Sequence, residues 1–444
     1  MIKVRFAPSP VGHLFVSGAR VALVNYLYAR RHSGHLLLRF DDLDQERSKP
    51  AYADAIEHDL AWLGLDWDDS FRQSDRLALY QQAAERLKQA GRLYPCFESD
   101  EELRAKYAFR QKRHQPTVYD RAMLKLTPAQ RAAAEAGGKR PHWRFRLSDR
   151  ALAWHDVVLG ARQAKLTAVS DPVLLRADGS VSPVLASAVD DIDTGITHVI
   201  RGEDNAASTG IQIDLFAALG ADPSRLCFAH LPPLAERERS RLGRRVGSLS
   251  LRSLRNDGVE ACVVAASLTQ SVVAGPVEPV ALAQLALGFE LARLSSAAAR
   301  FDAADLLALN RRVLQGLDYA AVAERLPGGA TETFWLAVRG CIDLLNEARG
   351  WWDVVAGTIV PPVIDGEREF LATAQDLLPA EPWDISVWAT WTDALAHATG
   401  RVGEALMLPL RLALTGEEQG PELAQLLPLM GRSRAANRLQ LAAA

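Results

Sequence analysis

The sequence predicts an α/β fold with a doubly wound parallel sheet, followed by an all-α C-terminal region. Apolar residues alternate from Ile2 to Phe6, which is the periodicity of a short strand. An amphipathic helix is expected over 20–31, and the largely apolar run at 36–40 is typical of a buried parallel strand. Such sheets bind ligands at the carboxyl ends of their strands. Two more helical segments continue the alternation, around 50–63 and 75–91.

The chain changes character after residue 95. Residues 96–186 mix charged helix and strand patterns, which indicates an α+β insertion. The sheet is expected to resume from Val189, with a strand at 197–200 and a helix at 208–219. Beyond about 290 the sequence is rich in Ala and Leu and shows no strand alternation, so this part is predicted to be helical.

Composition excludes several classes of protein. The 444 residues carry a formal net charge of −3, so the chain lacks the strongly basic balance that by itself indicates nucleic-acid binding. No apolar run approaches the roughly 20 residues of a membrane-spanning helix. The first residues read as a strand and not as a signal peptide, so a cytoplasmic location is expected. The four cysteines form no CxxC pair, which argues against a disulfide framework or a thiolate zinc site.

The N-terminal turn carries the most specific pattern in the chain. Residues 6–20 read FAPSPVGHLFVSGAR, a strand that enters a Pro/Gly turn and then a helix. This stretch resembles the opening of glutamyl-tRNA synthetases, which are class I aminoacyl-tRNA synthetases. The family's HIGH signature falls on Phe15-Val16-Ser17-Gly18, so its histidine is replaced by Phe15. The resemblance extends over essentially the whole chain.

The resemblance implies a Rossmann-like catalytic domain, an inserted domain and a helical anticodon-binding domain. The catalytic domain is expected at 1–95 and 187–235, and the insertion that contacts the tRNA acceptor stem at 96–186. A signature loop and stem-contact region follows at 236–300, and the anticodon-binding domain at 301–444. Some relatives carry a cysteine cluster after the first half-domain. Only Cys96 stands there in this chain, so no zinc is predicted.

The resemblance also implies an ATP site at the HIGH turn. Such enzymes activate an amino acid by attack of its carboxylate on the α-phosphate, so catalysis depends on positioning and electrostatic stabilisation. Phe15 cannot donate the histidine's hydrogen bond, a loss that typically costs roughly a hundred- to thousandfold in rate. Phe15 is expected to pack against apolar neighbours. His13 is not expected to replace the missing histidine, because a side chain two residues earlier in a turn usually points in another direction. The predicted ATP-binding residues are Pro10, Gly12, Phe15, Ser17, Gly18 and Arg244.

The family's second signature, KMSKS, falls on Arg241-Leu242-Gly243-Arg244-Arg245, in register with the GSLSL stretch that begins at Gly247. Both lysines have become arginine, which keeps the positive charge but changes its reach and geometry. Arg241, Arg244 and Arg245 are the predicted catalytic residues. Without the family context, the loop reads as a solvated charged segment.

At the amino-acid end, two arginines suit a dicarboxylic substrate because guanidinium pairs carboxylate bidentately. Asp41 matches the position that pairs with the substrate ammonium. Pro183 stands where the family has a tyrosine, so a phenol donor is lost. The substrate-binding residues that the resemblance implies are Arg5, Ala7, Ser9, Asp41, Pro183, Ser187 and Arg201.

Asp190, Asp191 and Asp193 could be metal ligands, but the resemblance favours a structural Val-Asp-Asp turn. Magnesium is expected to arrive with ATP as the substrate complex, and no resident metal is predicted. No G-x-x-x-x-G-K-[ST] phosphate loop occurs, which disfavours an unrelated NTPase.

Three functions remain open from the sequence. The first is a glutamate–tRNA ligase that uses ATP, glutamate and a tRNA of the glutamate type, as a monomer and without membrane contact. The second is an impaired or repurposed paralogue that binds tRNA or regulates a partner, since the departures cluster at the expected active site. The third is a pure tRNA-binding module carried by the basic features of residues 340–444.

Overall fold

The computed structural model describes residues 1–114, 116–236, 249–270 and 279–443. These residues form two compact units. The first contains the described residues up to Phe301 except Ser253–Val263, and the second contains Ser253–Val263 and the residues from Asp302 onward. The domain boundaries given above are finer than this division and stay predictions.

The first unit begins with a parallel sheet whose strands run in the order β1-β2-β3. Parallel pairing needs a crossover between successive strands, and a helix supplies it each time, as the sequence predicts. The elements are β1 (Lys3–Phe6), α1 (Val16–Arg31), β2 (His35–Phe40), α2 (Pro50–Trp62), β3 (Asp69–Arg72) and α3 (Leu77–Gln89).

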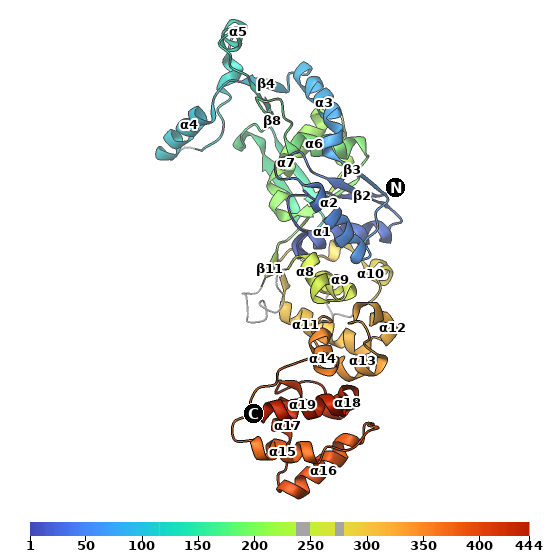
Figure 1. Cartoon of the computed structure of the whole chain (residues 1–444). Coiled ribbons are helices and arrows are strands. Elements are labelled where there is room, and N and C mark those ends of the chain that lie inside the picture. The colour runs from blue at the N-terminus through green and yellow to red at the C-terminus, as the bar shows by residue number, and fades with distance from the viewer. Residues whose placement is uncertain (115, 237–248, 271–278, 444) are drawn as a thin grey trace. The chain divides into compact units, whose positions relative to one another are not determined.

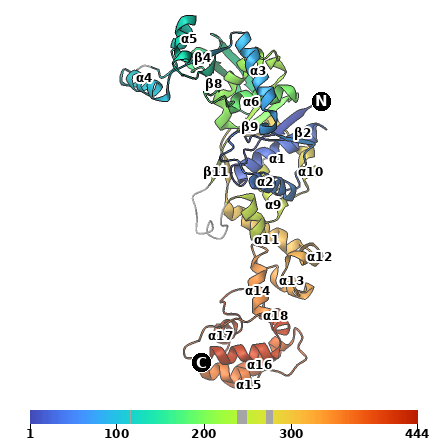
Figure 2. The same ribbon diagram turned by 45° about the horizontal axis from the view of Figure 1, so that its top comes forward.

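Both faces of this sheet are covered, which explains the uninterrupted apolar run in β2. Leu36 and Leu38 lie together with Leu60 of α2 on one face. Leu37 points to the opposite face and shares a core with Tyr80 of α3. Figure 2 shows α1 and α2 beside β2. The side chains of β2 thus pack against helices on both faces of the sheet, which confirms the predicted doubly wound arrangement.

The inserted segment forms its own antiparallel sheet, β4-β5-β8, and also a hairpin of β6 and β7. The hairpin joins the strands that follow the insertion, because β6 pairs with β10 through Asp156 and Phe228. The elements are β4 (Leu93–Cys96), α4 (Asp100–Lys112), α5 (Pro128–Ala136), β5 (His142–Phe145), β6 (Ala151–Asp156), β7 (Gly160–Lys165) and β8 (Val173–Leu175).

The expectation that the sheet resumes at Val189 is wrong. Residues 183–193 form the helix α6 (Pro183–Asp193), and the next strand begins at His198. The helix begins there because the Ser182 side chain accepts a hydrogen bond from the Leu185 N–H at 3.4 Å, and Pro183 stands at the first helical position. Proline is favoured at this position since no partner is needed for its missing N–H.

After α6 the chain returns to parallel pairing. Residues Cys227–Leu231 of β10 pair with His198–Gly202 of β9, so that His230 lies opposite Arg201. The Thr197 N–H donates to the carbonyl of Lys3, which ties this layer to β1. The further elements are β9 (His198–Gly202), α7 (Thr209–Ala218), β10 (Cys227–Leu231), β11 (Leu234–Glu236), α8 (Leu251–Asp257), α9 (Ala261–Gln270), α10 (Leu282–Gly288) and β12 (Ala299–Phe301).

The prediction that the chain lacks strands beyond about 290 needs one correction. Residues 299–301 form β12, which pairs in parallel with β11. From Asp302 onward the described part of the second unit is helical (Figure 1). Its helices are α11 (Ala303–Gly316), α12 (Tyr319–Val322), α13 (Glu332–Val338), α14 (Glu347–Ala356), α15 (Arg368–Asp376), α16 (Val387–Thr399), α17 (Glu404–Thr415), α18 (Leu423–Met430) and α19 (Arg432–Ala442).

The second unit is organised around buried tryptophans. Trp335 and Trp391 are fully buried, and each donates its indole N–H to a backbone carbonyl. Arg438 of the basic helix α19 is also buried and donates to the carbonyls of Leu414 and Gly357, so it has a structural role. Within the described residues, no helix is long and apolar enough to cross a bilayer.

Asp190 in α6 holds α6 against α3 and the segment before it. Its carboxylate is fully buried and accepts hydrogen bonds from Gln73, from Arg76 Nε at 2.9 Å and from the Tyr80 hydroxyl at 3.0 Å. Asp193 also pairs with Arg76, but its side chain is half exposed. The two acidic side chains therefore differ in burial although they share a partner.

Replacing Asp190 with Ala is expected to lower the free energy of unfolding by about 3–5 kcal/mol, because buried donors lose their acceptor. Asp193→Ala is the matched control, and its exposed pair should contribute at most about 1 kcal/mol. Urea unfolding of both variants measures the difference. Equal losses would contradict a structural role for Asp190.

Candidate active site

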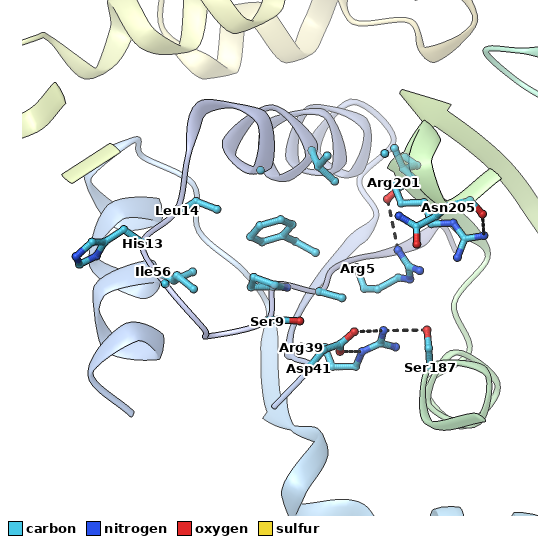
Figure 3. Close-up of a pocket in the computed structure, with 18 residues that line it drawn as sticks. Arg5, Ser9, His13, Leu14, Arg39, Asp41, Ile56, Ser187, Arg201 and Asn205 are labelled. Carbon is cyan, nitrogen blue, oxygen red and sulfur yellow. Dashed lines mark hydrogen bonds and ion pairs between the residues drawn. The ribbon is translucent and has the colours of Figure 1, made fainter. Parts of the chain in front are cut away.

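A pocket of about 350 Å³ opens at the carboxyl ends of β1, β2 and β9. This is the edge at which parallel sheets bind ligands. Figure 3 shows its two ends: His13, Leu14 and Ile56 lie at one, and the arginines and Asp41 at the other. The pocket therefore has a charged end and a less polar end.

Most of the predicted site residues of the described chain line this pocket. They are Arg5, Ala7, Ser9, Gly12, Gly18, Asp41, Ser187 and Arg201. Four predicted residues do not line it, namely Pro10, Phe15, Ser17 and Pro183. The predicted catalytic residues Arg241, Arg244 and Arg245 lie outside the described residues.

Phe15 does not pack into an apolar environment, so that expectation is wrong. Its side chain is 51% exposed, and the residue is the N-cap of α1. Its neighbours are held by backbone pairing: Val16 N–H donates to the Leu249 carbonyl, and Leu251 N–H donates to that of Leu14. Phe15 offers no side-chain acceptor to the first turn of α1. A helix N-terminus beside a pocket attracts anions.

Pro183 is also placed away from the pocket, because it begins α6 and is exposed. Ser187, one turn further along α6, reaches the pocket, where its hydroxyl accepts a hydrogen bond from Arg39 Nη2 at 3.0 Å. The helical structure of this segment determines which of its side chains face the site.

Asp191 of α6 neutralises two arginines from neighbouring strands. Its Oδ1 accepts from Arg5 Nε at 3.1 Å and from Arg39 Nη1 at 2.9 Å. All three side chains are almost completely buried. Shared, charge-assisted hydrogen bonds of this kind fix the side chains at the end of β1 and β2.

Asp41 is held by Arg39 through two hydrogen bonds, Nε to Oδ1 at 2.7 Å and Nη2 to Oδ2 at 3.2 Å. Burial raises the pKa of Asp41 above its ordinary value, although Arg39 opposes this. Burial alone would lower the pKa of Arg39, but Asp41 and Asp191 outweigh it and raise that pKa. The pair keeps one carboxylate at the border of the pocket.

Arg201 is the pocket arginine that has no carboxylate as a direct partner among the described residues, although Asp191, Asp204 and Asp156 act on it from farther away. Its Nε donates to His230 at 3.1 Å, and its Nη2 donates to Thr209 and to the Asn205 carbonyl. Among the described residues, no carboxylate lies within ion-pair distance of it. Burial, and then the nearby Arg5, lower the pKa of Arg201 to about 10. Arg201 therefore remains protonated at neutral pH.

Arg39 is not among the site residues predicted from the sequence, although residues 36–40 are expected there to form a buried strand. The signal was present, because Arg39 is a charged residue inside the apolar run of β2, which needs a buried partner. Asn205 also lines the pocket and was not among the predicted site residues. His13 also lines it, but its ring stacks edge-on against Tyr52 and receives a hydrogen bond from Arg252.

The described chain offers no group of three or more side chains that could hold a metal ion. Asp190 and Asp191 bind arginines instead. Cys96 is buried, and burial raises the pKa of its thiol to about 11, which is unfavourable for a thiolate ligand. The prediction that no zinc binds there stays a prediction.

The fold and the pocket agree with what known proteins show. Residues 1–307 match the family described as tRNA synthetases class I (E and Q), catalytic domain, and residues 364–443 match an anticodon binding domain. The chain therefore belongs to the class I tRNA synthetases of this E and Q family, and the resemblance seen at the N-terminal turn is confirmed.

Relatives that match this chain over its full length are named glutamate–tRNA ligases. The chain is 56% identical to glutamate–tRNA ligase 2 of Acidiphilium cryptum over 100% of both chains. It is 55% identical to glutamate–tRNA ligase 2 of Granulibacter bethesdensis over 99% of this chain and 98% of the relative. A crystal structure of glutamate–tRNA synthetase from Elizabethkingia anophelis has the same fold, with a TM-score of 0.82, 24% identity and 99% coverage of both chains.

Arg39 and Arg201 are expected to respond in opposite ways to replacement by Met. Arg39→Met leaves Asp41 without its ion-pair partner and Asp191 with Arg5 alone, and should cost about 3–5 kcal/mol of unfolding free energy. Because burial and then Arg5 lower the pKa of Arg201 to about 10 in the folded chain, its charged form opposes folding at neutral pH. This unfavourable contribution disappears only as the pH rises above about 10.

Arg201→Met is therefore expected to leave the free energy of unfolding at pH 7 unchanged or to raise it. Urea denaturation of the two variants beside the parent chain measures this. Similar losses for both variants would show that Arg201 is part of the structural network and not free for a ligand.

Proposed function

We propose that this chain is a glutamate–tRNA ligase. The observation that carries the proposal is the uncompensated Arg201 beside the Arg5–Asp191–Arg39 network. Arg5 and Arg39 form ion pairs with Asp191 and Asp41, whereas Arg201 forms no ion pair with any of the described residues. Glutamate carries two carboxylates and one ammonium, so its net charge of about −1 at neutral pH complements the pocket. The names of the full-length relatives support the same activity over an impaired or regulatory role.

Each polar end of glutamate has a matching group in the pocket. The side-chain carboxylate fits Arg201, with Arg5 beside it, because guanidinium donates paired N–H groups to carboxylate. The ammonium fits Asp41, whose side chain remains 21% exposed although it is bound to Arg39. This assignment leaves the α-carboxylate directed toward the end of the pocket formed by Gly12, His13 and Leu14.

The reaction follows from that orientation. An oxygen of the α-carboxylate attacks the α-phosphorus of ATP, and the bond from that phosphorus to the bridging oxygen of pyrophosphate breaks. Pyrophosphate leaves, and glutamyl-adenylate remains in the pocket. A ribose hydroxyl at the 3′ end of tRNA then attacks the carbonyl carbon, gives up its proton and displaces AMP. The chain has little covalent chemistry to perform, so its contribution is positioning and charge stabilisation.

ATP enters with Mg²⁺ as the substrate complex, and the end of the pocket near α1 suits its phosphates. Gly12 and Gly18 line this end, and a Cβ at Gly12 would meet no atom within 4 Å, so there is open space above the turn. The positive end of α1 favours phosphate oxygens. By the family resemblance, Arg241, Arg244 and Arg245 supply further positive charge.

The tRNA is the second substrate in this proposal. The match of residues 364–443 to an anticodon binding domain supports contact with a tRNA at that end of the chain. A tRNA of the glutamate type is proposed, since the relatives are named for it. Phosphate contacts of this kind weaken with salt, because binding releases counterions.

The first test of the proposal is ATP–pyrophosphate exchange with the purified chain. Exchange is expected with glutamate, in the presence of tRNA if not alone, and at most a trace with glutamine, whose amide cannot pair with Arg201. Arg201→Met should raise the KM for glutamate at least about a hundredfold, because a charge-assisted bidentate pair is lost. No exchange with glutamate under either condition would contradict the proposal.

The altered HIGH turn gives a second test. Phe15→His is expected to raise kcat for exchange at least about tenfold, because one preorganised donor is worth roughly a hundred- to thousandfold in such sites. The KM for glutamate should stay the same, since Arg201 and Asp41 are untouched. Phe15→Leu is the matched control. Equal kcat values for the His and Leu variants would show that this position does not face the phosphates.

A further inference from the structure

A buried acid–histidine pair lies behind Arg201. Asp156 ends β6 and His230 lies on β10, and both side chains are completely inaccessible to solvent. Asp156 Oδ2 is 2.5 Å from His230 Nδ1. Its Oδ1 accepts from the N–H groups of Val158, Leu159 and His230. Burial alone would raise the pKa of Asp156, but these hydrogen bonds outweigh it and lower that pKa, so the group is a carboxylate.

The pair fixes the tautomer of His230. A carboxylate only accepts hydrogen bonds, so Nδ1 of His230 carries the proton. The other ring nitrogen, Nε2, lies 3.1 Å from Arg201 Nε and 3.2 Å from the Thr209 hydroxyl. Arginine only donates, so Nε2 must be an acceptor. His230 is therefore the neutral Nδ1–H form, because a second proton would point at the Arg201 guanidinium.

The contacts of Arg201 explain what this tautomer achieves. Nε donates to His230, and Nη2 donates to Thr209 and to the Asn205 carbonyl, so two nitrogens are fixed from the protein side. Among the described residues, Nη1 of Arg201 has no hydrogen-bond partner, and the side chain borders the pocket. Rotation of the guanidinium would break three hydrogen bonds.

We propose that Asp156 and His230 act as a positioning pair that orients Arg201 toward the side-chain carboxylate of the amino-acid substrate. The inference rests on the proposed function, in which Arg201 binds that carboxylate. Asp156 comes from the inserted hairpin, which pairs with β10 beside β9. The inserted segment thus supplies part of the amino-acid pocket, and recognition of the substrate depends on its docking. Neither residue touches the substrate.

The test distinguishes the roles of the two ring nitrogens of His230. His230→Asn keeps a side-chain N–H for Asp156 but has no acceptor for Arg201, whereas His230→Gln can reach Arg201 with its amide oxygen. His230→Asn should raise the KM for glutamate about tenfold or more, in line with the roughly 10–100-fold cost of losing an orienting partner. The KM for ATP and kcat should change less than about twofold. His230→Gln should recover most of the loss.

A double-mutant cycle distinguishes positioning from a merely structural role. The affinity for a non-hydrolysable glutamyl sulfamoyl adenylate is measured by calorimetry for His230→Asn, Arg201→Met and the double variant. His230→Asn should have no further effect once Arg201 is absent, because coupled residues are not additive. Additive effects would overturn the positioning role. Undiminished binding by Arg201→Met alone would instead overturn the proposed function of Arg201.

A spectroscopic measurement on the unaltered chain covers the case in which the variants fail to fold. Nitrogen-15 NMR of histidine-labelled protein should show His230 as the neutral tautomer with the proton on Nδ1. A proton on Nε2 at neutral pH would overturn the inference without any mutation.

Discussion

The carboxylate of Asp191 is the interaction on which the pocket depends. It is buried at the end of α6 and accepts hydrogen bonds from Arg5 on β1 and Arg39 on β2. Two positive charges could not be buried side by side without it. Asp191 and Asp41 pair with those two arginines, whereas Arg201 forms no ion pair with any of the described residues.

This arrangement divides the arginines into two kinds. Arg39 is a structural residue that holds a carboxylate, Asp41, at the pocket border. Arg201 is held by neutral partners, which fix its direction without neutralising its charge. Partial burial of this cation lowers its pKa, and the proposed function pairs it with a substrate carboxylate. Under the proposed function, glutamate is preferred to glutamine, because an amide cannot supply a negative charge opposite Arg201.

The sequence predicts local features well and long-range ones poorly. Alternation and the apolar run revealed β1 and β2, since both depend only on neighbours in the chain. The family resemblance pointed to Arg5, Asp41 and Arg201, which line the pocket. Reasoning from the local pattern failed at Val189, where a Ser-Pro helix start outweighed the apolar pattern. It also failed at Phe15, whose environment depends on distant residues. The pairing of Asp156 with His230 could not be foreseen, because strand order brings together residues 74 positions apart.

The most direct measurement is a crystal structure of the chain with glutamate bound. The account predicts that the side-chain carboxylate lies within hydrogen-bond distance of the Arg201 guanidinium, and the ammonium within the same distance of Asp41. Arg5 and Arg39 should keep their hydrogen bonds to Asp191. A glutamate that left Arg201 without contact, or that displaced Arg39 from Asp191, would contradict the central claim.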